Sequence, residues 1–176
     1  MRPIVTFYIE EKQVQFELYP EYAPNAINGL IEAIQTKHLD NFNIERVVPG
    51  FVFQPWCDET KLPEFYQYVT DKEFETENHT FEKYSVGLAG DGQKISVPSC
   101  FFITLDDAFH LNQKFCKVGK VISGFEYLHE VENSELIDLS DQMGVKFMTP
   151  KNPIKFHDTT IELNGYEPKQ CIKYIE

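Results

Sequence analysis

The stretch from Asn43 to Trp56 (NIERVVPGFVFQPW) places one cation, Arg46, among apolar neighbours and then breaks at Pro49-Gly50. Arginine stays ionised at physiological pH, and burying an unpaired charge is costly. Either this guanidinium has a carboxylate partner, or it points into a pocket that needs its N–H groups. Taken alone, such an arginine is more often a structural ion-pair partner than a catalytic group.

Length, composition and charge limit the number of domains, the fold class and the binding partners that the chain can have. The chain has 176 residues, enough for one domain with a sizeable core and too few for two comfortable ones. Aromatic residues make up 14% of it, which suits a sheet-rich globular fold. Its 28 acidic residues outnumber 16 basic ones, giving a formal net charge of -12. That balance opposes nonspecific binding to nucleic acid or to anionic membranes.

Cysteine spacing and hydropathy indicate a protein with reduced thiols in a reducing cellular compartment. The four cysteines show no CxxC pair, and none lies near a histidine pair at zinc-ligand intervals. We therefore expect free thiols, no metal and no cofactor. No apolar run approaches the roughly 20 residues of a membrane span. The first residues already alternate like a strand, so we expect no signal peptide, a cytoplasmic location and, without a coiled-coil seam, a monomer.

The first third of the chain predicts a hairpin and a helix. Two alternating apolar runs, around Phe7 and Phe16, flank Glu10 to Lys12, which is typical of a β-hairpin. The next segment has Pro24 where the first helical turn would lie. A helix there would present one apolar stripe, formed by Ile27, Leu30, Ile31 and Ile34.

Further along, the pattern predicts mostly short strands. These are YSVGLAG (84–90), SCFFITL (99–105), KVGKVISG (117–124) and a closing FHDTTIEL (156–163), with a short helix at FEYLHEVEN (125–133). Many short strands with two helices predict a closed or nearly closed sheet capped by helices. We assign residues 1–165 to a single domain with an insertion at 135–150, where the pattern is unclear, and 166–176 to a C-terminal tail.

Six blocks of sequence carry a family resemblance. At ELYPEYAPNAINGL, ERVVPGFVFQ, FETE, SVGLAG, SCFFIT and KVGKVISG, in this order, the chain resembles a cyclophilin, a peptidyl-prolyl cis-trans isomerase. The order and spacing follow that family from Ile4 to Leu163. The resemblance implies a mainly β fold: a closed eight-stranded antiparallel β-barrel capped by two α-helices. It also implies a substrate groove on the outer face of the barrel, not in its lumen.

The resemblance assigns roles to individual residues. Arg46 takes the position of the family's catalytic arginine, and Gln54 that of a glutamine that orients the arginine and contacts substrate. Phe51, Phe102 and Leu111 match the floor and walls of the proline pocket. On residue type alone, the two phenylalanines would be core residues and the glutamine could simply satisfy backbone groups.

Three further positions complete the implied groove. Ala89 matches a residue whose backbone holds the peptide. His110 stands where many relatives carry Trp, and Phe115 where many carry His. Since relatives bind cyclosporin through the indole N–H of that Trp, His110 implies weak cyclosporin binding.

The chain also departs from the family pattern. Glu45 replaces a histidine before the arginine, and a local bulge could let it pair with Arg46. Pro55-Trp56 replaces a flexible Gly-Gly, Gly90 stands where relatives often have Asn, and Cys100 replaces a groove glutamine. These changes remove polar contacts and stiffen one loop, so a reduced activity stays open.

The implied reaction needs the residue types that this stretch offers. An X-Pro bond rotates over a barrier of about 18–20 kcal/mol because its nitrogen lone pair is delocalised. An arginine can donate to the nitrogen of the twisted bond or hold the adjacent carbonyl. One charged hydrogen bond is worth about 1.5–3 kcal/mol, or about tens to a few hundredfold in rate. The apolar wall must supply the rest by excluding water.

Strand geometry sets a condition on this site. In a regular strand Phe51 and Phe53 would share a face and Gln54 would point away. Convergence with Arg46 requires the chain at Pro49-Gly50, or near Gln54, to leave the regular pleat. The adjacent Phe101 and Phe102 should split, one toward the barrel core and one toward the groove.

Two functions fit these observations. The first is a prolyl isomerase that acts on X-Pro bonds in peptides and folding proteins. The second is a binding module that holds proline-containing segments with little turnover, as a chaperone or adaptor. Both predict proline-containing peptides or unfolded proteins as partners. We favour the enzyme because Arg46, Phe51, Phe102 and Leu111 are all present.

Overall fold

The first two strands form the predicted hairpin. The computed structural model of the chain describes residues 2–55, 68–69, 73, 80–90 and 95–173. Strands β1 (Ile4–Ile9) and β2 (Lys12–Leu18) pair antiparallel across a two-residue turn. Glu10 has a positive φ of 49° in this turn, as tight hairpins require. The apolar side chains that alternate along both strands are buried.

Helix α1 (Pro24–Gln35) begins where the proline predicts. Its apolar stripe is buried in the core. The N–H groups of Asn25 and Ala26 donate to the Glu73 carboxylate at 2.9 and 3.1 Å. A carboxylate at this end satisfies unpaired N–H groups and complements the helix dipole.

One antiparallel sheet accounts for most of the chain. Among the described residues it has ten strands, in the order β11-β3-β4-β7-β6-β8-β2-β1-β12, with β5 beside β7. The strands that follow the first hairpin are β3 (Phe42–Val48), β4 (Val52–Pro55), β5 (Tyr68–Val69), β6 (Ser85–Gly90), β7 (Ile95–Thr104), β8 (Cys116–Ser123), β11 (Ile154–Phe156) and β12 (Asp158–Glu162).

The two edges of this sheet meet through its last two strands. β11 pairs with β3 and β12 with β1, and only His157 separates β11 from β12. The His157 N–H donates to the Tyr8 carbonyl at 3.0 Å, and its own carbonyl accepts the Asn41 N–H at 3.1 Å. β11 and β12 therefore act as one bent strand that closes the barrel. The sheet path has nine strands instead of the expected eight because this closing strand is interrupted.

Aromatic side chains fill the barrel. Phe7 stacks on Phe101 with ring centroids 4.6 Å apart, and Phe42 stacks on Phe156 at 5.2 Å. Phe7 also contacts Phe16 at 5.0 Å. Stacked and edge-on rings of this kind pack as densely as other protein cores. The lumen is therefore a core, and a peptide has to bind elsewhere.

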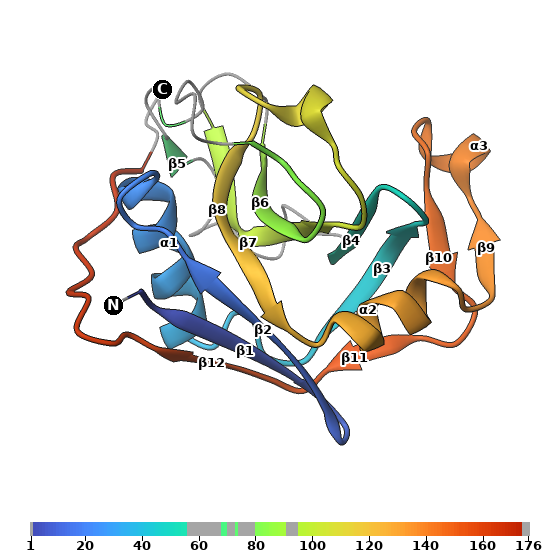
Figure 1. Cartoon of the computed structure of the whole chain (residues 1–176), viewed down its shortest axis with the longest axis horizontal. Helices are drawn as coiled ribbons and strands as arrows, with labels where there is room; N and C mark the ends of the chain where they lie inside the picture. Colours follow the sequence, from blue (N-terminus) through green and yellow to red (C-terminus); the bar gives the residue numbers. More distant parts are fainter. Residues whose placement is uncertain (1, 56–67, 70–72, 74–79, 91–94, 174–176) are drawn as a thin grey trace.

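Two helices cap the barrel, as predicted, and the described residues also include a short helix and a 3-10 turn that were not predicted. Helix α2 (Phe125–Glu132) buries Leu128 and Val131 in the same core that α1 covers. Figure 1 shows α1 and α2 on opposite sides of the barrel. The additional elements are a short helix, α3 (Ser140–Met143), and a 3-10 turn, η3 (Phe109–Leu111).

The segment whose pattern was unclear forms a separate small sheet. Strands β9 (Leu136–Asp138) and β10 (Met148–Pro150) pair antiparallel, with α3 in the connection between them. We call this unit the β9–β10 hairpin. In Figure 1 it stands at the right-hand end of the molecule, beside β3. The hairpin therefore lies next to β3, the strand that carries Arg46, and is close enough to contact the candidate site.

The C-terminal residues lie along α1. The Tyr166 hydroxyl donates to Asn28 Oδ1 at 2.6 Å, and the Ile172 N–H donates to Asn25 Oδ1 at 2.6 Å.

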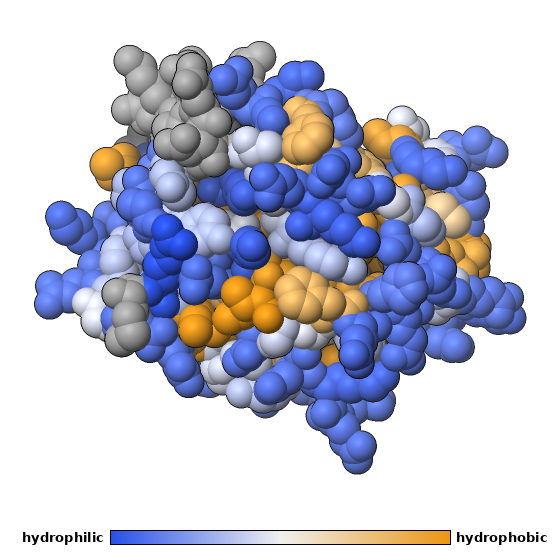
Figure 2. All heavy atoms as spheres, in the orientation of Figure 1, coloured by the Kyte–Doolittle hydropathy of each residue, from blue (hydrophilic) through white to orange (hydrophobic). Residues whose placement is uncertain are grey.

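Figure 2 shows a mostly hydrophilic face, with apolar side chains gathered over β8 and α2, where Ile122 and Phe125 are partly exposed. Over the residues that the structure describes, no helix has the length and apolar character needed to cross a membrane.

Candidate functional site

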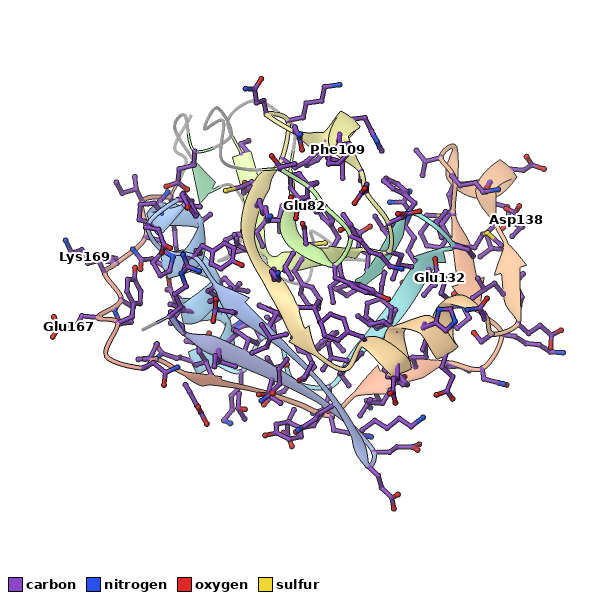
Figure 3. All side chains as sticks on the ribbon, viewed as in Figure 1. Glu82, Phe109, Glu132, Asp138, Glu167 and Lys169 are labelled. Atoms are coloured by element: carbon purple, nitrogen blue, oxygen red, sulfur yellow. The ribbon has the colours of Figure 1, made fainter. Side chains whose placement is uncertain are left out.

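A tight turn brings Phe51 out of the strand pattern. The Phe51 N–H donates to the Val48 carbonyl at 2.9 Å, and Gly50 has a φ of 73°. Proline at the second position and a left-handed glycine at the third are the signature of a type II turn. The Glu132 carboxylate at the end of α2 accepts the Gly50 N–H and so ties this turn to the helix (Figure 3).

A β-bulge turns Arg46 to the outer face of the barrel. Ile44 lies opposite Pro55 and Arg46 lies opposite Gln54, so Glu45 is an extra residue in β3. Ile44 and Val47 both enter the barrel core although they are three positions apart. In a regular strand Arg46 would share the face of Ile44; the bulge instead directs it outward beside Gln54.

Two acceptors hold the guanidinium. Nη1 of Arg46 donates to Oε1 of Gln54 at 3.1 Å. Nε and Nη2 both donate to the backbone carbonyl of Lys146, at 3.0 and 2.7 Å. Lys146 belongs to the β9–β10 hairpin, one hundred positions further along the chain. The guanidinium is therefore fixed from two sides by neutral oxygens.

The state of Arg46 follows from these contacts. Partial burial lowers its pKa from the ordinary value, but an arginine remains ionised at any physiological pH. Its ring neighbour is Phe51, whose centroid lies 5.7 Å from the guanidinium carbon. Of the five N–H groups of a guanidinium, three take part in these bonds. Within the described part of the chain, the other two N–H groups are left to donate to another molecule.

An apolar cluster lies beside the arginine on the outer face. It consists of Val48, Val52, Phe81, Phe102, Ala108 and Leu111, with Phe51 and Phe115 packed against it. The rings of Phe102 and Phe81 stack at 5.6 Å, and Phe115 meets Phe102 edge-on at 5.9 Å. This cluster is separate from the barrel core. It combines the three residues that the resemblance assigns to the proline pocket, Phe51, Phe102 and Leu111, with Phe115 from the implied groove.

The geometric condition on the strands is met at the first of the two expected places. The type II turn at Pro49-Gly50 lets Phe51 join the outer cluster, whereas Phe53 is fully buried in the barrel core. The two rings therefore do not share the face that a regular strand would give them, because Phe51 belongs to the turn and not to the strand. Phe101 and Phe102 split as predicted, into the core and the outer cluster.

The remaining predicted residues lie around this cluster. The exposed His110 is in η3, with its ring 5.4 Å from that of Phe51. Ala89 is half-buried in β6, where the pairing with β7 shifts register between Leu88 and Gly90. A Cβ on Gly87, earlier in β6, would meet the Phe102 ring at 2.5 Å, so β6 passes directly beside the cluster.

The family departures fall in different places. Glu45 is exposed, and the described part of the chain shows no ion pair between it and Arg46, so the bulge does not neutralise the guanidinium. Pro55 is buried at the end of β4, and the Cys100 thiol lies 3.6 Å from its carbonyl oxygen. Trp56, the other half of the replaced Gly-Gly, lies outside the described residues, as do Cys57 and the FETE block.

Sequence reasoning missed two kinds of site residue. Phe81, Val48, Val52 and Ala108 build the outer cluster, but on residue type alone they are indistinguishable from core residues. The Lys146 carbonyl was missed because a backbone acceptor leaves no mark in residue type. Within the residues that the structure describes, no group of His, Cys, Asp or Glu side chains could hold a metal ion.

Comparison with known proteins places this geometry in a family context. The family model for the cyclophilin type peptidyl-prolyl cis-trans isomerase matches residues 4–156. The chain is 32% identical to peptidyl-prolyl cis-trans isomerase B of Bacillus subtilis, over 74% of this chain and 92% of that protein. It is 26% identical to human peptidyl-prolyl cis-trans isomerase-like 3, over 92% of this chain and 98% of the relative.

Solved structures show the same fold. A cyclophilin type peptidyl-prolyl cis-trans isomerase from Cryptosporidium parvum superposes with a TM-score of 0.74 at 21% identity, covering 92% of this chain and 98% of that one. A second structure of that protein, determined in the presence of the dipeptide Ala-Pro, superposes with a TM-score of 0.72 over 90% of this chain and 98% of its own.

Proposed function

The chain belongs to the cyclophilin-type peptidyl-prolyl cis-trans isomerase family, and on that premise we propose that Arg46 is the group that accelerates the rotation. The chain is an enzyme of the class that interconverts the cis and trans forms of X-Pro bonds. Its substrates in this proposal are proline-containing peptides and unfolded proteins. The observation that carries the assignment is the position of the half-buried guanidinium, held by neutral acceptors beside an apolar cluster.

Rotation requires stabilisation of a state in which the prolyl nitrogen regains its lone pair. The pyrrolidine ring packs against Phe102, Phe115 and Leu111 in this proposal, and burial of its apolar area supplies binding. The two N–H groups of Arg46 left over by Gln54 and Lys146 donate to the twisted amide. No bond forms or breaks and no proton is transferred, so no nucleophile or general base is needed.

The fixed orientation of the guanidinium contributes to the rate. A donor that is already aimed at the position of the developing lone pair needs no reorganisation during the reaction. The cluster beside it excludes water, which strengthens a charged hydrogen bond. The free energy available from one such bond predicts a loss of about tenfold to a few hundredfold in kcat/KM when Arg46 is removed.

The test measures cis–trans exchange of an Ala-Pro peptide by NMR magnetisation transfer, which needs no coupling protease. Arg46→Ala should lose about tenfold to a few hundredfold in exchange rate while still shifting the peptide resonances on binding. Arg2, the chain's only other arginine, pairs with Glu17 and Glu21 on the surface, so Arg2→Ala is the matched control. Equal exchange rates for Arg46→Ala and Arg2→Ala would remove the proposed role.

One observation also keeps a binding module as the second candidate. The Lys146 carbonyl occupies two of the guanidinium N–H groups, which leaves fewer donors for the twisted bond. A protein that holds proline segments without turning them over needs only the apolar cluster. Saturable binding of the peptide by the wild type, with no increase in exchange rate, would support the module over the enzyme.

A further inference from the structure

The peptide unit between Lys146 and Phe147 has a partner on each side. Its carbonyl oxygen accepts two hydrogen bonds from Arg46, at 2.7 and 3.0 Å. Its N–H donates to the hydroxyl oxygen of Ser140 at 3.0 Å. Because a peptide unit is planar, a hydrogen bond to its N–H also fixes the direction of its carbonyl. Ser140 thus determines where the carbonyl that holds Arg46 points.

Ser140 is itself held in place from the other direction. Its backbone N–H donates to Asp138 Oδ1 at 2.9 Å. The neighbouring Ser140 hydroxyl and N–H, with the Lys146 ammonium, lower the pKa of the Asp138 carboxyl below its usual range. The Ser140 hydroxyl itself donates to the Phe147 carbonyl at 3.4 Å.

These contacts form a chain from Asp138 to Arg46. The Ser140 N–H donates to the Asp138 carboxylate, and the Ser140 hydroxyl oxygen accepts from the Phe147 N–H. The Lys146 carbonyl, on the other side of the same peptide, accepts from Arg46. Figure 3 shows Asp138 on β9, at the far side of the β9–β10 hairpin from the barrel.

Side-chain packing between this part of the hairpin and the barrel is interrupted on one side. A cavity of about 390 Å³ lies between β3 and the hairpin, lined by residues that include Ile44, Glu45, Leu139, Met143 and Phe147. Side chains that border a cavity lose contacts on that side. Phe147 is only 4% exposed, so the 146–147 peptide is held by the packing of this ring together with its hydrogen bonds.

We propose that Ser140 is a positioning residue for Arg46, acting through the Lys146–Phe147 peptide, and that its hydroxyl thereby increases the rate of prolyl isomerisation. This inference rests on the proposed function of Arg46. Ser140 touches no substrate in this scheme. Its effect is to hold one acceptor of the guanidinium at a fixed angle, so that the remaining N–H groups stay aimed at the groove.

The first experiment observes Arg46 directly. Only two arginines occur in the chain, so a ¹⁵N-labelled sample gives two Nε–H signals, which Arg2→Ala assigns. We expect Ser140→Ala to shift the Arg46 signal and to raise its exchange rate with water severalfold. Ser140→Thr, which keeps the hydroxyl, should restore the wild-type exchange.

A matched serine in the same region serves as the control. Ser134 donates its hydroxyl to the Val131 carbonyl at 2.7 Å and has no bond to the 146–147 peptide. Ser134→Ala should therefore leave the Arg46 signal unchanged. An Arg46 signal in Ser140→Ala that matches the one in Ser134→Ala would overturn the inference, whatever the activities are.

The second experiment uses a double-mutant cycle on the cis–trans exchange rate. Ser140→Ala should lower kcat/KM about threefold to tenfold, as expected for one neutral hydrogen bond. In an Arg46→Ala background the same change should have no effect, because its route to the reaction is gone. Equal losses in both backgrounds would show that Ser140 acts through general stability and would overturn the inference.

The two proposals fail in distinguishable ways. The proposed function fails when Arg46→Ala is as active as the wild type. The inference fails when the Arg46 Nε–H signal does not change in Ser140→Ala, or when the losses of kcat/KM in the double-mutant cycle are additive. An intact circular dichroism spectrum and an unchanged melting temperature for each variant exclude unfolding as the cause of a loss.

Discussion

Arg46 and Gln54 face each other directly across the β3–β4 pair, and the amide oxygen of Gln54 accepts a hydrogen bond from the guanidinium at 3.1 Å. Gln54 is buried, so its amide has few alternative partners. The relationship depends on the bulge at Glu45, which places both side chains on the outer face. One of the two acceptors that hold the guanidinium therefore comes from the neighbouring strand, and the other from the β9–β10 hairpin.

Replacing this amide tests its orienting role. Gln54→Leu keeps the size of the side chain but removes the acceptor, so the guanidinium loses one of its two fixed contacts. We expect kcat/KM to fall about threefold to tenfold, measured by cis–trans exchange of an Ala-Pro peptide. Gln13→Leu, at an exposed position of β2, is the control. An unchanged kcat/KM in Gln54→Leu would show that the amide is a structural partner of Arg46 and does not contribute to the rate.

The split of Phe101 and Phe102 predicts two different phenotypes. Phe101→Ala opens a cavity in the barrel core and should lower the free energy of unfolding by about 3–5 kcal/mol, with little change in rate per folded molecule. Phe102→Ala removes a wall of the outer cluster and should lower kcat/KM by at least about tenfold. Urea unfolding and peptide exchange measure the two effects. The same ratio of activity to stability loss in both variants would contradict separate roles.

Gly87 leaves space for the rings of the outer cluster. A Cβ at this position would lie 2.5 Å from Phe102 and 2.7 Å from Phe81. Gly87→Ala should therefore displace both rings, with a loss of about 1–3 kcal/mol in the free energy of unfolding, and it should weaken peptide binding. Thermal unfolding and peptide titration check the two results. Wild-type affinity in this variant would show that the rings do not form the proline pocket.

His110 predicts weak cyclosporin binding, because an exposed imidazole stands where the resemblance expects an indole. His110→Trp restores the N–H donor and adds apolar area beside Phe51, so we expect the Kd for cyclosporin to fall by about tenfold. Calorimetric titration measures it. Phe109→Trp, at the neighbouring exposed position, controls for the addition of an indole. An equal gain in both variants would mean that position 110 has no special role.

Asp138 predicts an acid-sensitive β9–β10 hairpin. Its folded-state pKa lies below the ordinary value of about 3.9, so between the two values the folded protein binds fewer protons than the unfolded chain. The stabilisation is complete above the ordinary pKa and is lost as pH falls through the folded pKa. The stability difference between wild type and Asp138→Asn should therefore shrink in acid, as measured by urea unfolding at several pH values. A pH-independent difference would refute the assignment.

The sequence was sufficient for the barrel and for four of the eight residues of the outer cluster. Alternation and turn residues predicted the β1–β2 hairpin, and Pro24 with its apolar stripe predicted α1. The many short strands predicted a closed or nearly closed sheet, and the resemblance carried by the six motif blocks implied the barrel. Strand alternation predicted the split of Phe101 from Phe102.

Other features depend on the backbone and could not be predicted in this way. NIERV contains no glycine or proline to announce the bulge at Glu45, and the bulge appears only when β3 is paired with β4. The Lys146 carbonyl carries no residue signature, and its contact with Arg46 joins segments one hundred positions apart. Phe81 and its apolar neighbours differ from core residues only in which side of the sheet they cover.

The pairing of β1 with β12 has a consequence for biosynthesis. Of the described strands in this sheet, β1 is synthesised first and β12 last, so the circle of hydrogen bonds is complete only after β12 has left the ribosome. Until then both margins of the nascent sheet carry unpaired backbone groups that could recruit a neighbouring polypeptide. A chain truncated before Asp158 should therefore aggregate and not persist as a smaller functional unit.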